Sequence, residues 1–151
     1  MPQSLARVYV HLVFSTKHRT PWLKDAGVRD ELYRYMATIL IGLESPAILI
    51  NGVEDHVHVL FTLSRNYAIK KIVQDAKADT SLWIKKKGVA YSDFHWQAGY
   101  GAFSVSQSML DEVVRYIRDQ EEHHKKRSYQ DEFRRLCELH EIEIDERYVW
   151  D

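Results

Sequence analysis

The order of segments with strand-like and helix-like hydrophobic patterns constrains the fold of this chain more than any other feature. Strand patterns, in which apolar residues recur at every second position or run together, cover residues 6–16, 47–53, 56–63 and 102–105. Helical spacing covers residues 25–43 and 68–87. The order strand, helix, strand, strand, helix, strand is the ferredoxin-like βαββαβ pattern of an α+β protein. We therefore expect an antiparallel sheet with both helices on one face and the other face left open for function.

The length and the charge distribution indicate one domain with a distinct end. A chain of 151 residues is a single-domain length, so we place one domain at residues 1–151. Further helices are expected over 108–126, where Ser108 and Asp111 resemble a capping box, and over 130–140. Residues 128–151 hold three Lys or Arg and eight Asp or Glu, whereas the first 127 residues hold 18 and 14. We expect 128–151 to be an acidic helical extension, while the rest carries the positive charge that phosphate binding needs.

Composition excludes several classes of protein. No apolar run approaches the roughly 18 residues that a membrane span needs, and the first residues lack the pattern of a signal peptide. Cys137 is the only cysteine, which excludes an internal disulfide and a cysteine zinc site. We therefore expect a cytoplasmic protein with no membrane partner.

A histidine pair lies in the strand predicted at 56–63. His56 and His58 stand two residues apart, so their side chains leave the same face of that strand. The opposite face is wholly apolar and suited to packing under the helices; it holds Val57, Val59, Phe61 and Leu63. Two imidazoles side by side can hold one divalent metal ion. The competing interpretation is a histidine pair on the surface.

Tyr116 and Gln120 stand four residues apart in a predicted helix, which puts them on one helical face. If that face lies over the sheet, the amide oxygen of Gln120 can join the metal ion while Tyr116 lies beside it. A tyrosine hydroxyl has an ordinary pKa of about 10 and becomes a useful nucleophile when a metal polarises the phosphate it attacks. The competing interpretation is a tyrosine packed in the core and a solvated glutamine.

Several stretches of the chain carry a family resemblance. They are VYVHLVF and TKHRTP near the start, DHVHVL at 55–60, WQAGY and FSVS within 96–106, and YIRDQ at 116–120. EEHHK at 121–125 and DERYVW at 145–150 resemble one subgroup. Over nearly its whole length the chain resembles the single-tyrosine HUH transposases of bacterial and archaeal insertion sequences, including their domesticated relatives that act on repeated palindromes.

The resemblance implies an enzyme that cleaves and rejoins single-stranded DNA at hairpin-bearing ends. His56, His58 and Gln120 would bind Mg²⁺ or Mn²⁺, and Tyr116 would join the DNA 5′-phosphate and free a 3′-hydroxyl. Members are homodimers, and in some of them the tyrosine helix serves the partner's metal site. A phosphotyrosine exchanges one phosphodiester for another, so no nucleotide cofactor is expected. Such a protein would associate with the nucleoid when it acts.

Basic and imidazole side chains near these motifs are candidates for DNA binding, because they can neutralise phosphates. They are His11, Lys17, Arg19, Lys77, Lys85 and Arg115. Solvated helix faces are the competing interpretation for the basic groups, and a structural role is the competing interpretation for His11.

Three alternatives stay open. One is a domesticated repeat-associated HUH endonuclease without a mobile element of its own. Another is a non-catalytic nucleic-acid-binding module on a ferredoxin-like sheet, although no strand here is rich in the aromatic residues that such modules expose. The third is an unrelated metal-dependent hydrolase, whose site would normally include carboxylates, whereas Asp55 is the only acid beside the histidine pair.

Overall fold

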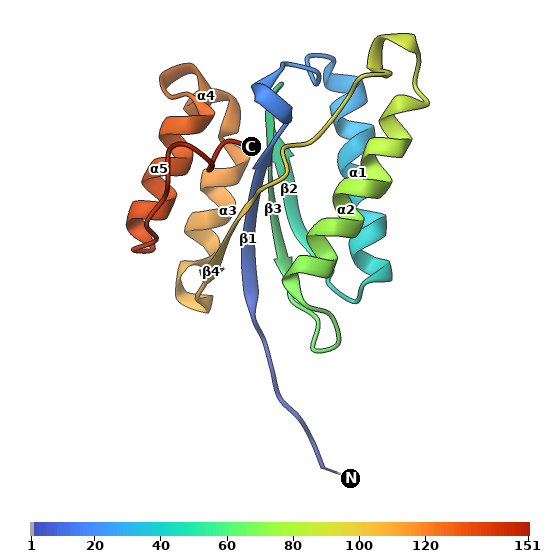
Figure 1. Cartoon of the computed structure of the whole chain (residues 1–151). Helices are drawn as coiled ribbons and strands as arrows, with labels where there is room; N and C mark the ends of the chain where they lie inside the picture. The colour runs from blue at the N-terminus through green and yellow to red at the C-terminus, as the bar shows by residue number, and fades with distance from the viewer. Residues whose placement is uncertain (1) are drawn as a thin grey trace.

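A four-stranded antiparallel sheet lies between two layers of helices in the computed structural model, which describes residues 2–151 (Figure 1). The strands are β1 (Tyr9–Ser15), β2 (Ala47–Gly52), β3 (His56–Thr62) and β4 (Gly101–Val105), in the spatial order β2-β3-β1-β4. Two helices, α1 (Ala26–Gly42) and α2 (Ile69–Lys85), make the crossovers between them. This is the predicted ferredoxin-like arrangement of an α+β protein. Within the described residues, no helix is both long and apolar enough to cross a membrane.

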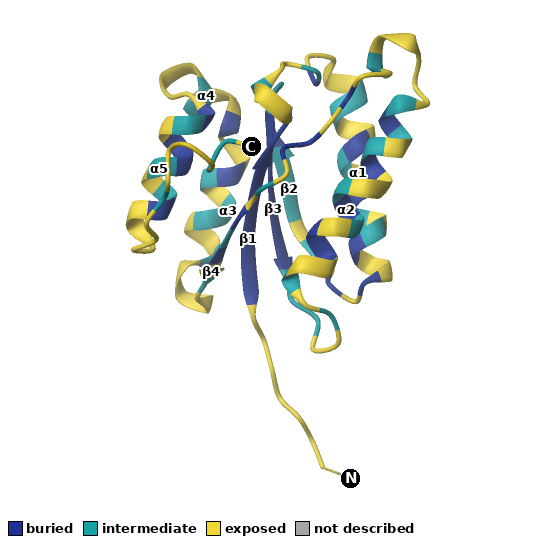
Figure 2. Ribbon diagram, viewed as in Figure 1, coloured by how far each residue is buried: buried dark blue, intermediate teal, exposed yellow. Residues whose placement is uncertain are grey.

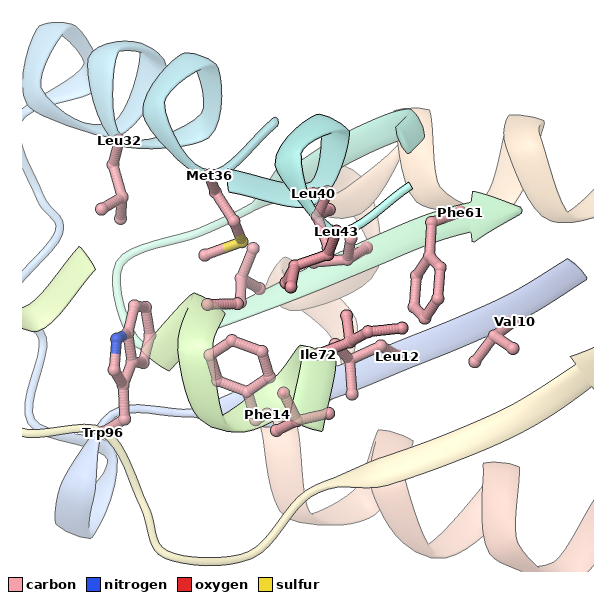
Figure 3. Packing of buried hydrophobic residues seen from close by; sticks show 14 of the residues in the cluster. Val10, Leu12, Phe14, Leu32, Met36, Leu40, Leu43, Phe61, Ile72 and Trp96 are labelled. Atoms are coloured by element: carbon pink, nitrogen blue, oxygen red, sulfur yellow. The ribbon is translucent and has the colours of Figure 1, made fainter. Parts of the chain in front are cut away.

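The main core lies between the sheet and helices α1 and α2 (Figure 3). The strands supply Val10, Leu12, Phe14, Val57, Val59 and Phe61, and the helices supply Leu32, Met36, Leu40, Ile72, Val73 and Ala76. Each fully buried aliphatic side chain contributes about 1.5–3 kcal/mol to folding. Because alternate residues of a strand point to opposite faces, burying these side chains sends His56 and His58 to the other face.

That other face of the sheet is also covered, so the expectation of an open face was wrong (Figures 1 and 2). Helices α3 (Leu110–Arg118), α4 (Gln120–Lys126) and α5 (Tyr129–Leu139) form the second layer. A smaller core joins α5 to the sheet and consists of Val13, Phe103, Tyr129, Phe133 and Cys137. The sheet face that carries His56 and His58 therefore lies in the interior of a layered structure.

The helix predicted over 108–126 is divided at Asp119, whose φ of −94° and ψ of 26° lie outside the helical region. The expected capping box does not form. Ser108 lies in a short 3-10 turn and shares a hydrogen bond with the Ser106 hydroxyl (3.0 Å), and α3 starts without a side-chain cap. Tyr116 consequently lies near the end of α3, and Gln120 is the first residue of α4.

The acidic stretch after residue 127 folds back onto the rest of the chain. Ser128 caps α5 by accepting a hydrogen bond from the backbone N–H of Asp131 (3.2 Å). Beyond α5, the carbonyl of Trp150 accepts from the Arg19 guanidinium (2.7 Å), and the carbonyl of Asp151 accepts from the backbone of Gly99 (2.9 Å). These bonds tie the final residues to the loops at one end of β1 and β4.

Candidate active site

The histidine pair of β3 is held from behind, so that one nitrogen of each ring faces a common space. Both imidazoles are fully buried. His56 Nδ1 shares a hydrogen bond with the Asp55 carboxylate (2.7 Å), and His58 Nδ1 shares one with His11 Nε2 (2.8 Å). A partner at one ring nitrogen fixes the orientation of the ring and leaves the other nitrogen available as a ligand. The two Nε2 atoms are therefore the natural ligand atoms of this pair.

Gln120 reaches the same space from the first turn of α4. Its Oε1 lies 3.1 Å from His56 Nε2, and its side chain is fully buried. Its Nε2 is buried as well and has no hydrogen-bond partner among the described residues. The structure thus brings the three predicted ligand residues together, although the helix break puts Gln120 and Tyr116 on different helices.

A fourth group at this point, Glu132 of α5, was missed by the sequence analysis. Its Oε1 lies 2.5 Å from His58 Nε2 and 3.6 Å from His56 Nε2, and the residue is 3% exposed. The sequence signal for Glu132 is an acid on the apolar face of α5. Tyr129 lies three residues before it, and Phe133 follows it directly. Because acids on an apolar helix face are rarely buried without a partner, that position indicated a specific role.

Burial and charge act against each other in this cluster. Burial would lower the pKa of His56, but its hydrogen bond with the Asp55 carboxylate and the negative charge of the nearby Glu132 carboxylate outweigh it and raise the pKa to about 9. Burial lowers the pKa of His58 despite its contact with Glu132. Burial would raise the pKa of Glu132, but the two imidazoles hold it well below its usual range. Glu132 is therefore anionic at neutral pH. Its carboxylate faces imidazole nitrogens of His56 and His58, each of which can bind either a proton or a metal cation.

Tyr116 lies beside the cluster of its own chain. Its ring centroid is 5.9 Å from that of His58, and its ring stacks on His123 at 4.6 Å. Burial raises the pKa of the Tyr116 hydroxyl well above its usual value, and the nearby Glu132 carboxylate adds to that effect. A free tyrosinate is thus disfavoured here, so a cation in the cluster would be needed to make this hydroxyl a nucleophile.

Asn51 of β2 holds the end of the tyrosine helix, and sequence analysis did not single it out. Its side-chain amide donates to the carbonyls of Ile117 (2.9 Å) and Arg118 (3.1 Å). Asn51 pairs across the sheet with His58. One strand pair therefore positions both the His58 side chain and the helix that carries Tyr116.

A cavity of about 780 Å³ opens beside Tyr116, between α3, α5 and β4. Its lining combines apolar and basic side chains with two acidic ones, Glu112 and Glu132; the apolar and basic residues include Phe103, Val113, Leu136, Lys126, Arg127 and Arg135. Apolar surface suits nucleic-acid bases and basic groups suit phosphates.

The structure does not gather the six candidate DNA-binding residues at one place. His11 is buried against His58, and Arg19 bonds to the carbonyl of Trp150. Lys77 and the exposed Lys17 line a second cavity of about 740 Å³. Lys85 ends α2, on the opposite side of the sheet from the active site, and Arg115 is exposed on α3 next to Tyr116.

A family model described as "Transposase IS200 like" matches residues 4–120. The chain belongs to this transposase family. The matched segment contains the histidine pair, Tyr116 and Gln120, and it ends before α5. A comparison with curated proteins finds no significant match.

Two solved structures share the fold of this transposase. A protein of Deinococcus radiodurans R1, assigned as a transposase, superposes with a TM-score of 0.62 at 19% identity, covering 80% of this chain and 95% of that one. The REP-associated tyrosine transposase bound to a REP hairpin superposes with a TM-score of 0.61 at 11% identity, covering 82% and 73%. At these identities the likeness establishes a common α+β architecture.

Proposed function

We propose that this transposase cleaves and rejoins single-stranded DNA through a covalent bond between Tyr116 and a DNA 5′-phosphate. The observation that supports this most directly is the convergence of His56 Nε2, His58 Nε2 and the Gln120 amide oxygen at one buried point beside the Tyr116 ring. Mg²⁺ or Mn²⁺ held by these residues would polarise the scissile phosphate and lower the barrier to attack.

The residues of the chain then have separate tasks. Asp55 and His11 orient the imidazoles, and α3 presents the Tyr116 hydroxyl. Tyr116 Oη forms a bond to phosphorus while the bond from phosphorus to the 3′-oxygen breaks. The tyrosine hydroxyl proton passes to solvent, and the departing 3′-oxygen takes a proton from solvent to become a 3′-hydroxyl. Attack by a 3′-hydroxyl on the phosphotyrosine reverses these changes and joins strands. The number of phosphate ester bonds is the same throughout, so no nucleotide cofactor is required.

The proposed substrate is single-stranded DNA with a hairpin near its end. The cavity beside Tyr116 favours a single-stranded substrate, because its lining includes apolar groups that suit bases and basic groups that suit phosphates. The proposal of a hairpin in the substrate is supported by the structural neighbour, which is bound to a REP hairpin. That neighbour also favours a second candidate, a domesticated endonuclease that acts on repeats, which would use the same chemistry. The homodimer implied by family resemblance remains part of the proposal.

Tyr116→Phe tests the nucleophile. Phe keeps the ring and its stacking on His123 while removing only the hydroxyl, so the variant should fold and bind Mn²⁺ and hairpin DNA as the wild type does. Incubation with hairpin-bearing single strands and Mn²⁺, followed by denaturing electrophoresis, should show a protein–DNA adduct for the wild type and none for Tyr116→Phe. Tyr100→Phe, a change on the exposed surface, is the matched control and should form the adduct normally.

Two results would contradict the proposal. An adduct in Tyr116→Phe that peptide mapping places on Tyr100 or Tyr129 would mean that another tyrosine is the nucleophile. Strand cleavage by Tyr116→Phe without an adduct would mean that water attacks, and the metal-dependent hydrolase would then be the better interpretation.

A further inference from the structure

Three buried polar atoms at the histidine pair lack hydrogen-bond partners among the described residues. They are His58 Nε2, Glu132 Oε1 and Gln120 Nε2. The first two lie only 2.5 Å apart, yet they are not aligned for a hydrogen bond. Leaving such atoms unpaired is costly in a protein interior. His58 Nε2 and Glu132 Oε1 can both bind a metal ion, and two such atoms that converge without forming a hydrogen bond are arranged as ligands of a common cation would be.

The position of Glu132 fits a ligand better than a simple counter-ion. Its Oε1 faces the Nε2 atoms of both His56 and His58, at 3.6 and 2.5 Å. The other nitrogen of each ring is already held, by Asp55 and His11. Two imidazoles and one carboxylate therefore surround one point, and carboxylate oxygen is the ligand type that Mg²⁺ and Mn²⁺ favour.

We propose that Glu132 is an anionic ligand of the divalent ion held by His56 and His58, so that α5 completes the metal centre from outside the segment that the family model matches. This inference rests on the proposed metal dependence of the site, but not on the chemistry of Tyr116. Tyr129 and Phe133, on either side of Glu132, are buried in the smaller core and hold α5 against the sheet, so the Glu132 side chain is positioned at the histidine pair.

The proposal changes what is expected of the protein without DNA. A site made of two imidazoles and an amide is neutral, and it would bind a divalent ion weakly until a phosphate oxygen joined it. A carboxylate supplies the missing negative charge. The full chain should therefore bind one Mn²⁺ per subunit before any DNA is present.

Glu132→Gln separates a ligand from a counter-ion by the sign of its effect. If Glu132 is a ligand, the substitution should weaken Mn²⁺ binding to the DNA-free chain by about tenfold or more, measured by calorimetry and by the electron paramagnetic resonance of free Mn²⁺. If Glu132 only balances protonated imidazoles, its removal frees their Nε2 atoms, and Mn²⁺ should bind equally well or more tightly. The second result would overturn the proposal.

Glu138→Gln is the matched control, because it removes the same charge from an exposed position on the same helix. It should change Mn²⁺ affinity less than twofold, so a tenfold loss in this variant would show that general electrostatics explain the effect and would overturn the proposal. Glu132→Asp keeps the charge but shortens the side chain, and it should bind Mn²⁺ with intermediate affinity.

A measurement on the wild type covers the case in which Glu132→Gln does not fold. Protein labelled with ¹³C at its glutamate carboxyl groups should show a strong ¹³C hyperfine coupling to bound Mn²⁺, together with coupling to two imidazole nitrogens. Nitrogen couplings without the ¹³C coupling would overturn the inference. Failure of the wild type to form a tyrosine adduct would contradict the proposed function alone and would leave the metal ligands as they are.

Discussion

Lys17 and Lys77 carry the same charge and line the same cavity, but their surroundings differ. The ammonium group of Lys77 donates to the backbone carbonyls of residues 97, 98 and 99, at 2.8, 3.2 and 2.6 Å. It also lies 5.1 Å from the centre of the Phe14 ring. An ammonium group has three N–H donors, so these bonds use all of them. Lys17 is exposed and can meet a phosphate without giving up such contacts.

Substituting each lysine by Met should therefore have different effects on DNA binding. Lys17→Met should weaken binding of single-stranded DNA and reduce the slope of log affinity against log salt by roughly 0.7, the value for one phosphate contact. Lys77→Met should leave that slope unchanged but lower the melting temperature, because three loop carbonyls lose their donor. Fluorescence anisotropy over a salt series and thermal unfolding measure the two effects. Equal losses of slope in both variants would contradict this assignment.

Sequence patterns could predict those site residues whose placement depends on local geometry. The period of a strand places His56 and His58 on one face, whatever lies above them. Glu132 could not be assigned in this way, because its contact with β3 depends on how α5 packs on the sheet. The same holds for His11, whose hydrogen bond to His58 depends on the register between β1 and β3.

The break between α3 and α4 has its cause in a neighbouring strand. In a continuous helix, the carbonyls of Ile117 and Arg118 would accept hydrogen bonds from the backbone four residues later. Here they accept from the side chain of Asn51 on β2. The sequence from 110 to 126 contains no proline or glycine that predicts a break. Strand and helix identities therefore followed from local patterns, whereas this boundary depended on a tertiary contact.

Asn51→Ala should impair the tyrosine without affecting the metal site. Loss of two hydrogen bonds should destabilise the fold by about 1–2 kcal/mol and loosen the end of α3. The rate of adduct formation should fall roughly tenfold or more, since misplacing a reacting group by about 1 Å can cost on the order of 100-fold. Mn²⁺ affinity should stay as in the wild type.

Asn66→Ala, at an exposed asparagine bonded to Glu44, is the control. A normal rate in Asn51→Ala would show that this contact does not position Tyr116.

Within one chain, the layered architecture brings together all the groups of the candidate site. The sheet supplies His56 and His58, and the helices on its second face supply Tyr116, Gln120 and Glu132. The proposed homodimer is therefore not needed to bring Tyr116 to a metal centre. Each subunit would use its own tyrosine.

Mixing two inactive variants tests this arrangement. Tyr116→Phe lacks the nucleophile, and the double variant His56→Ala, His58→Ala lacks the metal ligands. If each chain uses its own tyrosine, co-expressed differently tagged variants should copurify as a mixed dimer and form no DNA adduct. An adduct at up to half the wild-type level would show that the tyrosine acts on the partner's site. Light scattering that finds only monomers at micromolar concentration would contradict the homodimer, but not the pairing of Tyr116 with its own histidines.

The position of α5 also bears on how inactive copies of such a gene arise. A premature stop codon after residue 120 would leave the whole matched segment, with both motifs, intact. It would nevertheless remove Tyr129, Glu132 and Phe133 and leave the inner side of β1 and β4 uncovered. A truncated copy of the gene could therefore still encode both motifs while its protein product no longer folds. Selection on this gene should consequently act as strongly on α5 as on the motifs themselves.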